Sequence, residues 1–402
     1  MIVRLVAVWP AAVAVGATRY IALVVAAAAV AFGVPASAGS APVDEGWGVT
    51  DLHPIRGGIS SAVDVNDRGQ VAINALTPKG RVVAFVWQDG RARRLGTIGT
   101  SMSAISINEA GQVLGTYATK SGYRRAFVFE RGRLRDLGTL GGTETTAVAH
   151  NNRGQVVGRS RTAAGMQHAF LWERGRMVDL GTYGPAWKTS GATAINNNGE
   201  IVGWSKPLRG FPRAFRWVNR RMEYLGALPS DTAISEAVAI NDAGQIVGWS
   251  TVGPQRRGRP FLWEAGTMTN LGSLGPEWYD TAPVAINQEG LVVGYYQSSS
   301  GKYHVFVWRD GLRRIGTLGG AAASTSGHPD VVNEVGQVVG WSATRRGRGH
   351  GFIWQDGKMT DLGTAGGIGS SATAINEAGD IVGERRTDGG ADHAVLWRRR
   401  GA

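Results

Sequence analysis

Six acidic residues lie in the segments that join successive repeats of this sequence, where side chains from different repeats can meet. Carboxylates paired at roughly 5 to 9 Å can hydrolyse glycosidic bonds, one serving as acid and the other as base or nucleophile. The six residues are Glu144, Asp231, Glu236, Glu277, Asp280 and Asp330. A carbohydrate-active hydrolase or lyase is therefore one function to test, although the sequence alone does not single out a catalytic pair.

Two of the joining segments also carry aromatic residues in similar settings, at 184–188 and 275–280. Aromatic faces beside polar groups can stack on a sugar or hold a peptide side chain. The alternative is that the two Trp only fill space in the fold. The candidate binding residues are Trp187, Lys188, Glu277, Trp278, Tyr279 and Asp280.

Several kinds of chemistry lack their motifs here. The chain has no Cys, which excludes thiol catalysis and thiolate-bound metals. The sequence also lacks Gly-x-Ser-x-Gly, His-Glu-x-x-His and a dinucleotide-binding Gly-x-Gly-x-x-Gly. We therefore expect no cofactor.

An internal repeat sets the elements that must position these residues. Asn followed three residues later by Gly occurs eight times, with steps of 42, 43, 45, 45, 46, 46 and 43 residues. A period in this range is typical of solenoids and propellers. The eight residues are Asn66, Asn108, Asn151, Asn196, Asn241, Asn287, Asn333 and Asn376.

Residues 192–228 illustrate one repeat. Four short strands are predicted at 192–195, 200–205, 213–217 and 222–226, with an Asn-x-x-Gly turn between the first two. The third strand is apolar at consecutive positions in most repeats, so neighbouring sheets must cover both of its faces. Gly recurs in the second strand of seven repeats, which predicts a bulge or a close approach of backbones there.

The two ends of the repeat region favour a closed ring. The last repeat stops after its third strand, at 395–397, whereas residues 47–52 resemble the fourth-strand segment 357–362. The N-terminal segment can therefore complete the last sheet and leave no long edge exposed. We predict an all-β protein, an eight-bladed β-propeller with four short antiparallel strands per blade, over residues 46–398. A seven-bladed ring is the alternative, because the first and last repeats fit the pattern least well.

A basic residue stands two positions before the third-strand aromatic, or its equivalent, in seven repeats. A ring of His suggests a metal, but third strands lie about two strand spacings of 4.7 Å outside the inner ring, too far apart to share ligand bonds near 2.1 Å. We expect these side chains to hydrogen-bond backbone between blades. The Asn-x-x-Gly turns carry too few acids for calcium, so no metal site is predicted. The seven residues are Arg125, His168, Arg213, Arg259, His304, His350 and His393.

The repeat resembles the HAF-type extracellular repeat, whose three letters are seen in residues 168–170. The flanking segments 136–142 and 155–158 fit that pattern too, and the resemblance covers residues 46–397. It implies a secreted, β-propeller-like repeat protein of a family with no defined activity, so no catalytic residue is carried over. Arg in place of His in three repeats puts a strict role for that His in doubt.

The first 38 residues are typical of a secretory signal peptide. Arg4 and Arg19 precede an apolar run at 21–34, which ends in Ala36-Ser37-Ala38. We expect cleavage after Ala38, a linker at 39–45 and a tail at 399–402, with no transmembrane domain in the mature chain. The alternative is a membrane anchor formed by an uncleaved signal.

The net charge is +12, from 43 basic and 31 acidic residues. Such a surface favours anionic partners, which outside a cell would be a cell-envelope polymer or an acidic polysaccharide, and no specific nucleic acid. The sequence therefore predicts a secreted, non-catalytic binding or scaffold module, which contacts its partner through its loop face, the face formed by the long loops within and between blades. A carbohydrate-active enzyme is the alternative, and the oligomeric state is left open.

Overall fold

Short turns separate short apolar segments along the whole repeat region, and each segment forms a β-strand. The computed structural model describes residues 46–55, 58–229, 234–252, 257–274 and 281–400. The chain divides into Met1–Gly39, which lies outside these residues, and Ser40–Ala402, to which everything below refers.

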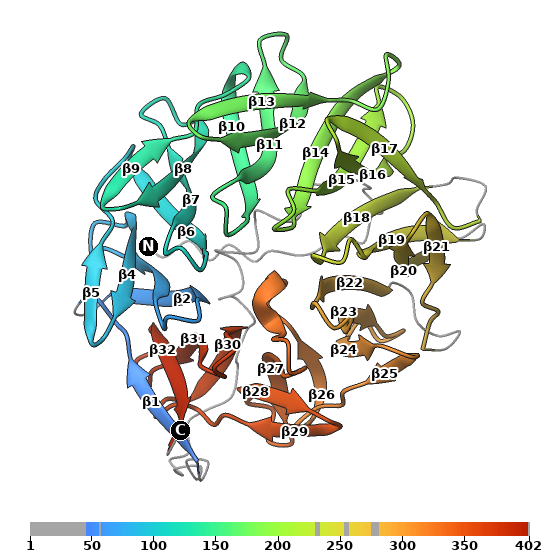
Figure 1. The fold of residues 1–402 in the computed structure, drawn as a ribbon. Coiled ribbons are helices and arrows are strands. Elements are labelled where there is room, and N and C mark those ends of the chain that lie inside the picture. The colour runs from blue at the N-terminus through green and yellow to red at the C-terminus, as the bar shows by residue number, and fades with distance from the viewer. Residues whose placement is uncertain (1–45, 56–57, 230–233, 253–256, 275–280, 401–402) are drawn as a thin grey trace, which may run out of the picture. The chain divides into compact units, whose positions relative to one another are not determined.

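The strands form eight four-stranded antiparallel sheets, the blades, which are numbered here along the chain and arranged in a ring (Figure 1). Blade 1 contains β2 (Ile59–Val65), β3 (Val71–Leu76), β4 (Val82–Gln88) and β5 (Arg91–Arg94). Blade 2 contains β6 (Ser101–Ile107), β7 (Val113–Ala118), β8 (Arg124–Glu130) and β9 (Arg133–Asp136). Blade 3 contains β10 (Gly141–His150), β11 (Val156–Thr162), β12 (Gln167–Glu173) and β13 (Arg176–Gly181). Blade 4 contains β14 (Trp187–Ile195), β15 (Ile201–Pro207), β16 (Arg213–Val218) and β17 (Arg221–Gly226).

The remaining four blades follow the same order from the inner to the outer strand. Blade 5 contains β18 (Ser235–Ile240), β19 (Ile246–Val252), β20 (Arg257–Glu264) and β21 (Thr267–Asn270). Blade 6 contains β22 (Thr281–Ile286), β23 (Val292–Gln297), β24 (Tyr303–Trp308) and β25 (Leu312–Arg314). Blade 7 contains β26 (Gly319–Ser324), β27 (Val338–Thr344), β28 (Gly349–Gln355) and β29 (Lys358–Asp361), with the 3-10 helix η1 (Pro329–Val331) after β26. Blade 8 contains β30 (Gly369–Ile375), β31 (Ile381–Arg386), β32 (Asp392–Arg399) and, as its outer strand, β1 (Trp47–Asp51).

The ring closes as the sequence predicts, and it has eight blades rather than seven. β1 pairs with β32 in antiparallel register, with Val49 opposite Trp397 and Thr50 opposite Leu396. Trp397 is fully buried, and Trp47 of β1 is 4% exposed. The first strand of the described chain therefore covers what would otherwise be an open apolar edge.

The repeated Asn residues do more than form turns. Each side-chain amide donates a hydrogen bond of 2.9–3.2 Å to the backbone carbonyl of the repeated Asn in the next blade. The eighth bond, from Asn376 to Asn66, closes the circle. The turn role is also confirmed, because each Asn side-chain oxygen accepts the backbone N–H four residues later, as at Gln70 and Gln155. Since a buried amide must be hydrogen-bonded, this belt fixes the distance between successive blades.

A second circle of hydrogen bonds runs beside the first. The residue after each repeated Asn donates its backbone N–H, over 2.7–3.2 Å, to the side chain of the equivalent residue in the next blade. The last of these bonds, from Glu377 to Asp67, again joins blade 8 to blade 1. Every blade is thus tied to both neighbours by polar bonds as well as by packing.

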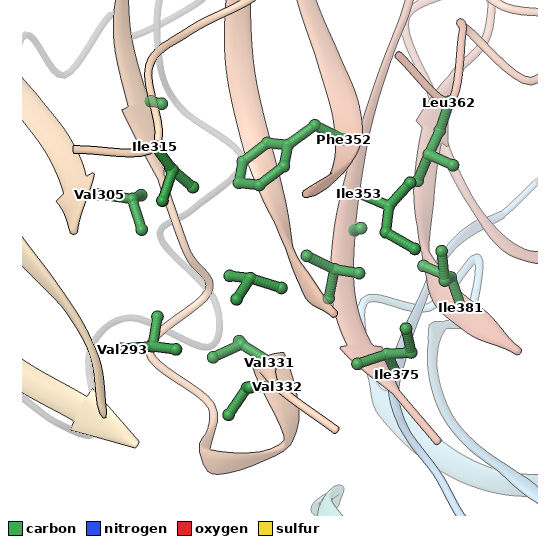
Figure 2. Close-up of a cluster of buried hydrophobic side chains, with 14 of the residues drawn as sticks. Val293, Val305, Ile315, Val331, Val332, Phe352, Ile353, Leu362, Ile375 and Ile381 are labelled. Atoms are coloured by element: carbon green, nitrogen blue, oxygen red, sulfur yellow. The ribbon is translucent and has the colours of Figure 1, made fainter. Parts of the chain in front are cut away.

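The core lies between the blades, because each blade presents apolar residues on both faces. The six third-strand residues Phe127, Phe170, Phe215, Phe261, Phe306 and Phe352 are fully buried or nearly so. One cluster joins blades 6, 7 and 8 and includes Val293, Phe352 and Ile375 (Figure 2). Val331 of η1 and Val332 belong to the same cluster (Figure 2), and η1 also contacts the inner strands β22 and β30 of blades 6 and 8.

Candidate functional site

At three places, each just before an Asn-x-x-Gly turn, this chain carries residue types that differ from those of the other repeats. The residue two before the repeated Asn is Ala or Ser in six blades, but it is Asp64 in blade 1. The residue immediately before that Asn is Ile or Val in seven blades, but it is His150 in blade 3. Blade 7 carries η1 at this place, with His328 at its N-cap and Asp330 inside it. All three departures introduce titratable groups at positions that are otherwise apolar or small.

Asp64 is held rigidly at the boundary between blades 1 and 2. It follows a bulge in β2, and its residue is only 2% exposed. One carboxylate oxygen accepts the backbone N–H of Val65 at 2.8 Å, and the other accepts that of Ile107 in β6 at 2.7 Å. These two bonds satisfy one lone pair on each oxygen of the buried carboxyl group and fix its direction.

His328 reaches across the ring from blade 7 to blade 2. Its Nε2 lies 3.3 Å from the backbone oxygen of Ile105, and its Nδ1 lies 3.2 Å from Oδ2 of Asp330. The Asp330 side chain retains 50% of its exposure, whereas that of His328 retains 14%. One side-chain ligand atom from each of Asp64, His328 and Asp330 lies within 4.8 Å of the other two. We call these three residues the axial cluster.

The charges of the axial cluster shift one another's pKa values. Burial and the nearby Asp330 raise the pKa of Asp64. Burial opposes protonation of His328, but the two carboxylates outweigh it and raise the pKa of the imidazole. Burial also acts to raise the pKa of Asp330, yet the hydrogen bond from His328 lowers it overall. The cluster therefore holds one carboxylate, Asp330, as an accessible anion beside an imidazole.

His150 lies next to this cluster, close enough for its charge to interact with those of His328 and Asp330. Burial lowers the pKa of His150 to about 4, so its imidazole is neutral at physiological pH. Its Nδ1 is buried and has no hydrogen-bond partner among the described residues. A neutral imidazole with an unused ring nitrogen can take up a proton or bind a cation.

The arrangement offers two kinds of chemistry. Carboxylate and imidazole groups of this kind act as acids and bases in hydrolysis. The same three side chains also have the donor atoms that bind a divalent cation. Of the six acids selected from the sequence, Asp330 is the one that belongs to the axial cluster. Asp64, His150 and His328 were not among the residues selected for chemistry.

Two further acids of that set are described, and they lie on strands rather than in loops. Glu144 lies on β10 and pairs with Arg161 at 2.9 Å, and Glu236 lies on β18. Asp231, Glu277 and Asp280 lie outside the described residues. Glu144, Glu236 and Asp330, the acids of the set that the structure describes, therefore lie on three different blades, 3, 5 and 7.

Glu236 gives a test of how burial affects stability. Burial raises its pKa to about 7, and attraction by Lys206 and Arg159 opposes this only in part. Because the pKa of Glu236 is higher in the folded than in the unfolded chain, its contribution to stability is fully present below about pH 4.5 and is lost as pH rises through about 7. We expect Glu236→Gln to raise the free energy of unfolding by about 1–3 kcal/mol at pH 8 and to leave it nearly unchanged at pH 4.5.

Denaturant unfolding at the two pH values measures this effect. Glu223→Gln, which removes an exposed acid of β17, is the matched control and should change little at either pH. Equal effects of the two substitutions at pH 8 would show that burial of Glu236 is not the cause.

The predicted binding residues are described only in part. Trp187 begins β14 and makes an edge contact with Tyr183, with ring centroids 5.6 Å apart. Tyr183 in turn contacts Tyr224 at 5.7 Å, and Lys188 donates to the backbone oxygen of Pro185. Glu277, Trp278, Tyr279 and Asp280 lie outside the described residues. A ligand at Trp187 and Lys188 stays a prediction.

The basic residues of the third strand bind differently from the prediction. His168 pairs with Asp179 of β13 at 2.9 Å, and His350 pairs with Asp361 of β29 at 2.8 Å, each within its own blade. Arg125 pairs with Asp136 at 2.9 Å in the same way. The expected hydrogen bonds to backbone between blades are therefore replaced, at these positions, by side-chain contacts with an Asp of the same blade. The strand register explains this pairing. Asp179 lies opposite Phe170, which is two residues from His168 on the same face of β12, so the side chains of His168 and Asp179 meet diagonally.

No family model and no curated protein matches the sequence. The HAF-type resemblance accordingly stays a prediction. Among the described residues, no helix has the length and apolar character needed to span a membrane.

Several solved structures share the architecture. A puromycin hydrolase is 15% identical with a TM-score of 0.51, over 89% of this chain and 60% of its own. Dipeptidyl peptidase 4 of Porphyromonas gingivalis is 12% identical with a TM-score of 0.55, over 86% of this chain and 58% of its own. The β-propeller domain of the Trilobed protease from Pyrococcus furiosus is 11% identical with a TM-score of 0.50, over 76% and 97%.

These comparisons correct the functional prediction. The sequence predicted a non-catalytic binding or scaffold module, with a carbohydrate-active enzyme as the alternative, but the similar propellers belong to enzymes named as peptidases or proteases and as a puromycin hydrolase. At this level of identity the likeness itself shows the β-propeller fold. This chain spans about 60% of the length of the puromycin hydrolase and 58% of that of dipeptidyl peptidase 4.

Proposed function

We propose that this chain is a hydrolase of peptide bonds and that the axial cluster is its working site. The observation that carries the proposal is that Asp64 of blade 1 meets His328 and Asp330 of blade 7 with ligand atoms within 4.8 Å of one another. Packing alone does not call for these groups, because the equivalent positions of the other blades are filled by small or apolar residues. Burying a charge is costly, so a charged cluster at such positions favours a chemical role.

The cluster supplies what hydrolysis of an amide requires. Water must be activated for attack on the carbonyl carbon, and the departing nitrogen must receive a proton. Asp330 is the member that water and substrate can reach, since half of its side chain is exposed. Asp64 and His328 are positioned by backbone groups of blade 2 and hold the negative charge in place. His150 adds a neutral imidazole beside them.

The substrate class comes from the comparisons. The enzymes whose propellers resemble this chain are named as a dipeptidyl peptidase and as a puromycin hydrolase. Those enzymes are longer than this chain, and the axial cluster gives this chain a reaction centre of its own. We therefore expect cleavage of peptides or of peptide-like amides.

A defined mixture of peptides, with free and with blocked ends, tests the proposal by mass spectrometry. The purified protein should cleave a subset of them, and Asp330→Asn should lower the rate by about 100-fold or more. His168→Gln, which removes an imidazole paired with an Asp on the outer side of blade 3, should leave the rate unchanged.

The thermal unfolding midpoints of both variants show whether the fold is retained. Two results would overturn the proposal: no cleavage of any peptide above the buffer rate, or equal cleavage by folded Asp330→Asn and the unmodified chain. The second result would identify a contaminating peptidase.

A further inference from the structure

We propose that the axial cluster binds one divalent transition-metal cation through Asp64, His328 and Asp330. This deepens the proposed function, since it concerns the same site, but it is argued from donor geometry and tested by binding alone. Two carboxylates and one imidazole form a mixed oxygen and nitrogen set.

The imidazole of His328 is oriented as a metal ligand is. Its Nε2 faces the backbone oxygen of Ile105, which can only accept, so this nitrogen must carry the proton of that hydrogen bond. The opposite nitrogen, Nδ1, faces Asp330, 3.2 Å from its Oδ2 and 3.3 Å from its backbone nitrogen, so a cation bound at Nδ1 would replace the hydrogen bond made there and release any proton that Nδ1 shares with the carboxylate. A ligating His usually donates its other N–H to a backbone carbonyl or a carboxylate in this way.

The spacing of the donor atoms also fits. Two ligands bound tetrahedrally to one Zn²⁺ at about 2.0–2.1 Å lie roughly 3.3–3.4 Å apart. The Nδ1 of His328 and Oδ2 of Asp330 are separated by 3.2 Å. Each carboxylate oxygen of Asp64 accepts one backbone N–H, which leaves a second lone pair on each for a cation.

The set predicts which cation is preferred and what its coordination would leave open. An imidazole ligand favours Zn²⁺ over Mg²⁺ and Ca²⁺, which prefer oxygen alone. Three protein ligands leave at least one position for water, as in catalytic rather than structural zinc sites. His150, with its buried and unpartnered Nδ1, offers a further imidazole nitrogen beside the cluster.

Equilibrium dialysis with elemental analysis tests the site on the full chain after removal of bound metal. We expect one Zn²⁺ per chain, with Mg²⁺ and Ca²⁺ binding at least about 100-fold more weakly. Asp330→Asn should weaken Zn²⁺ binding by about 100-fold or more, because a lost ligand costs no less than a lost supporting residue. His168→Gln is the matched control and should bind like the unmodified chain.

The proposal fails if the unmodified chain binds no Zn²⁺, or if folded Asp330→Asn and Asp64→Asn both bind it normally. It also fails if His168→Gln abolishes binding, because the ion would then lie on the outer side of a blade. X-ray absorption of the Zn²⁺-loaded unmodified chain needs no variant, and a coordination shell without imidazole nitrogen would contradict the site.

The outcomes separate this inference from the proposed function. Zn²⁺ binding at the cluster without peptide cleavage would retain the metal site and remove the peptidase. Cleavage that depends on Asp330, by a chain that binds no Zn²⁺, would retain the peptidase and remove the metal site.

Discussion

A chain that begins at residue 53, and so lacks β1, is expected to lose about 5 kcal/mol or more of unfolding free energy. Two buried apolar side chains, Trp47 and Leu52, are removed, each contributing about 1.5–3 kcal/mol. The backbone pairing with β32 is also lost, which uncovers Leu396 and Trp397. Denaturant unfolding followed by Trp fluorescence and by circular dichroism measures the change.

A rearranged chain gives the matched control. The backbone N–H of Arg400 lies 2.7 Å from the oxygen of Gly46, so a short turn can join these two residues. Moving residues 46–52 behind Arg400 through such a turn keeps every strand and changes only the connection. This variant should regain the lost stability. If the truncated chain is as stable as the full one, closure by β1 is not what holds the ring together.

The second large effect is expected from Gly203→Ala in β15. An added Cβ would overlap the backbone oxygen of Gly191 and would lie 2.9 Å from Cα of Ala192. This contact is with the backbone of the inner strand at its bulge, between Ala192 and Ala194, so no side-chain movement can relieve it. We expect a loss of about 3 kcal/mol or more of unfolding free energy, measured by denaturant titration.

The effect should be specific to this position of the blade. Gly389→Ala is the control, because its nearest neighbour, the hydroxyl of Thr387, would be 3.9 Å from the added Cβ. We expect that substitution to change stability by less than about 0.5 kcal/mol. Equal effects of the two substitutions would mean that a general loss of Gly flexibility, and not the approach of two backbones, explains the recurrence of Gly.

The repeat made most of the fold predictable. Asn at a regular spacing gave the number of blades, and the similarity of 47–52 to 357–362 located the strand that closes the ring. These features depend on local chemistry: a turn, a bulge or an edge that must be covered. The two circles of hydrogen bonds were not predicted, because a donor in one repeat and an acceptor in the next are visible only once the blades are side by side.

The axial cluster could not be predicted for a related reason. Attention to the repeat emphasises what recurs, whereas Asp64, His150 and His328 are positions where the repeat is broken. The sequence did carry a signal of the cluster: an Asp and a His stand at repeat positions that are otherwise occupied mainly by Ala and Ile. Which broken positions meet depends on the curvature of the ring, which brings His328 to Ile105 across 223 residues of sequence.

The search of the loop segments for functional residues found only one member of the axial cluster. Asp330 was among the six acids because it was assigned to a segment between repeats, but the structure places it in η1, after the inner strand β26 of blade 7. Of the other five acids, Glu144 and Glu236 lie on β10 and β18 and are not members of the axial cluster. Asp64 and His150 each lie one or two residues before an Asn-x-x-Gly turn, at the opposite end of the inner strands from the long loops. An expectation that binding groups belong to long loops directs the search away from that end.

Crystals of the unmodified chain grown with Zn²⁺, measured on both sides of the zinc absorption edge, show directly whether the axial cluster binds the ion. We expect one strong anomalous peak at about 2.0–2.2 Å from oxygens of Asp64 and Asp330 and from Nδ1 of His328. No peak at these three side chains, or a peak only at the outer His168 and Asp179, would contradict this expectation.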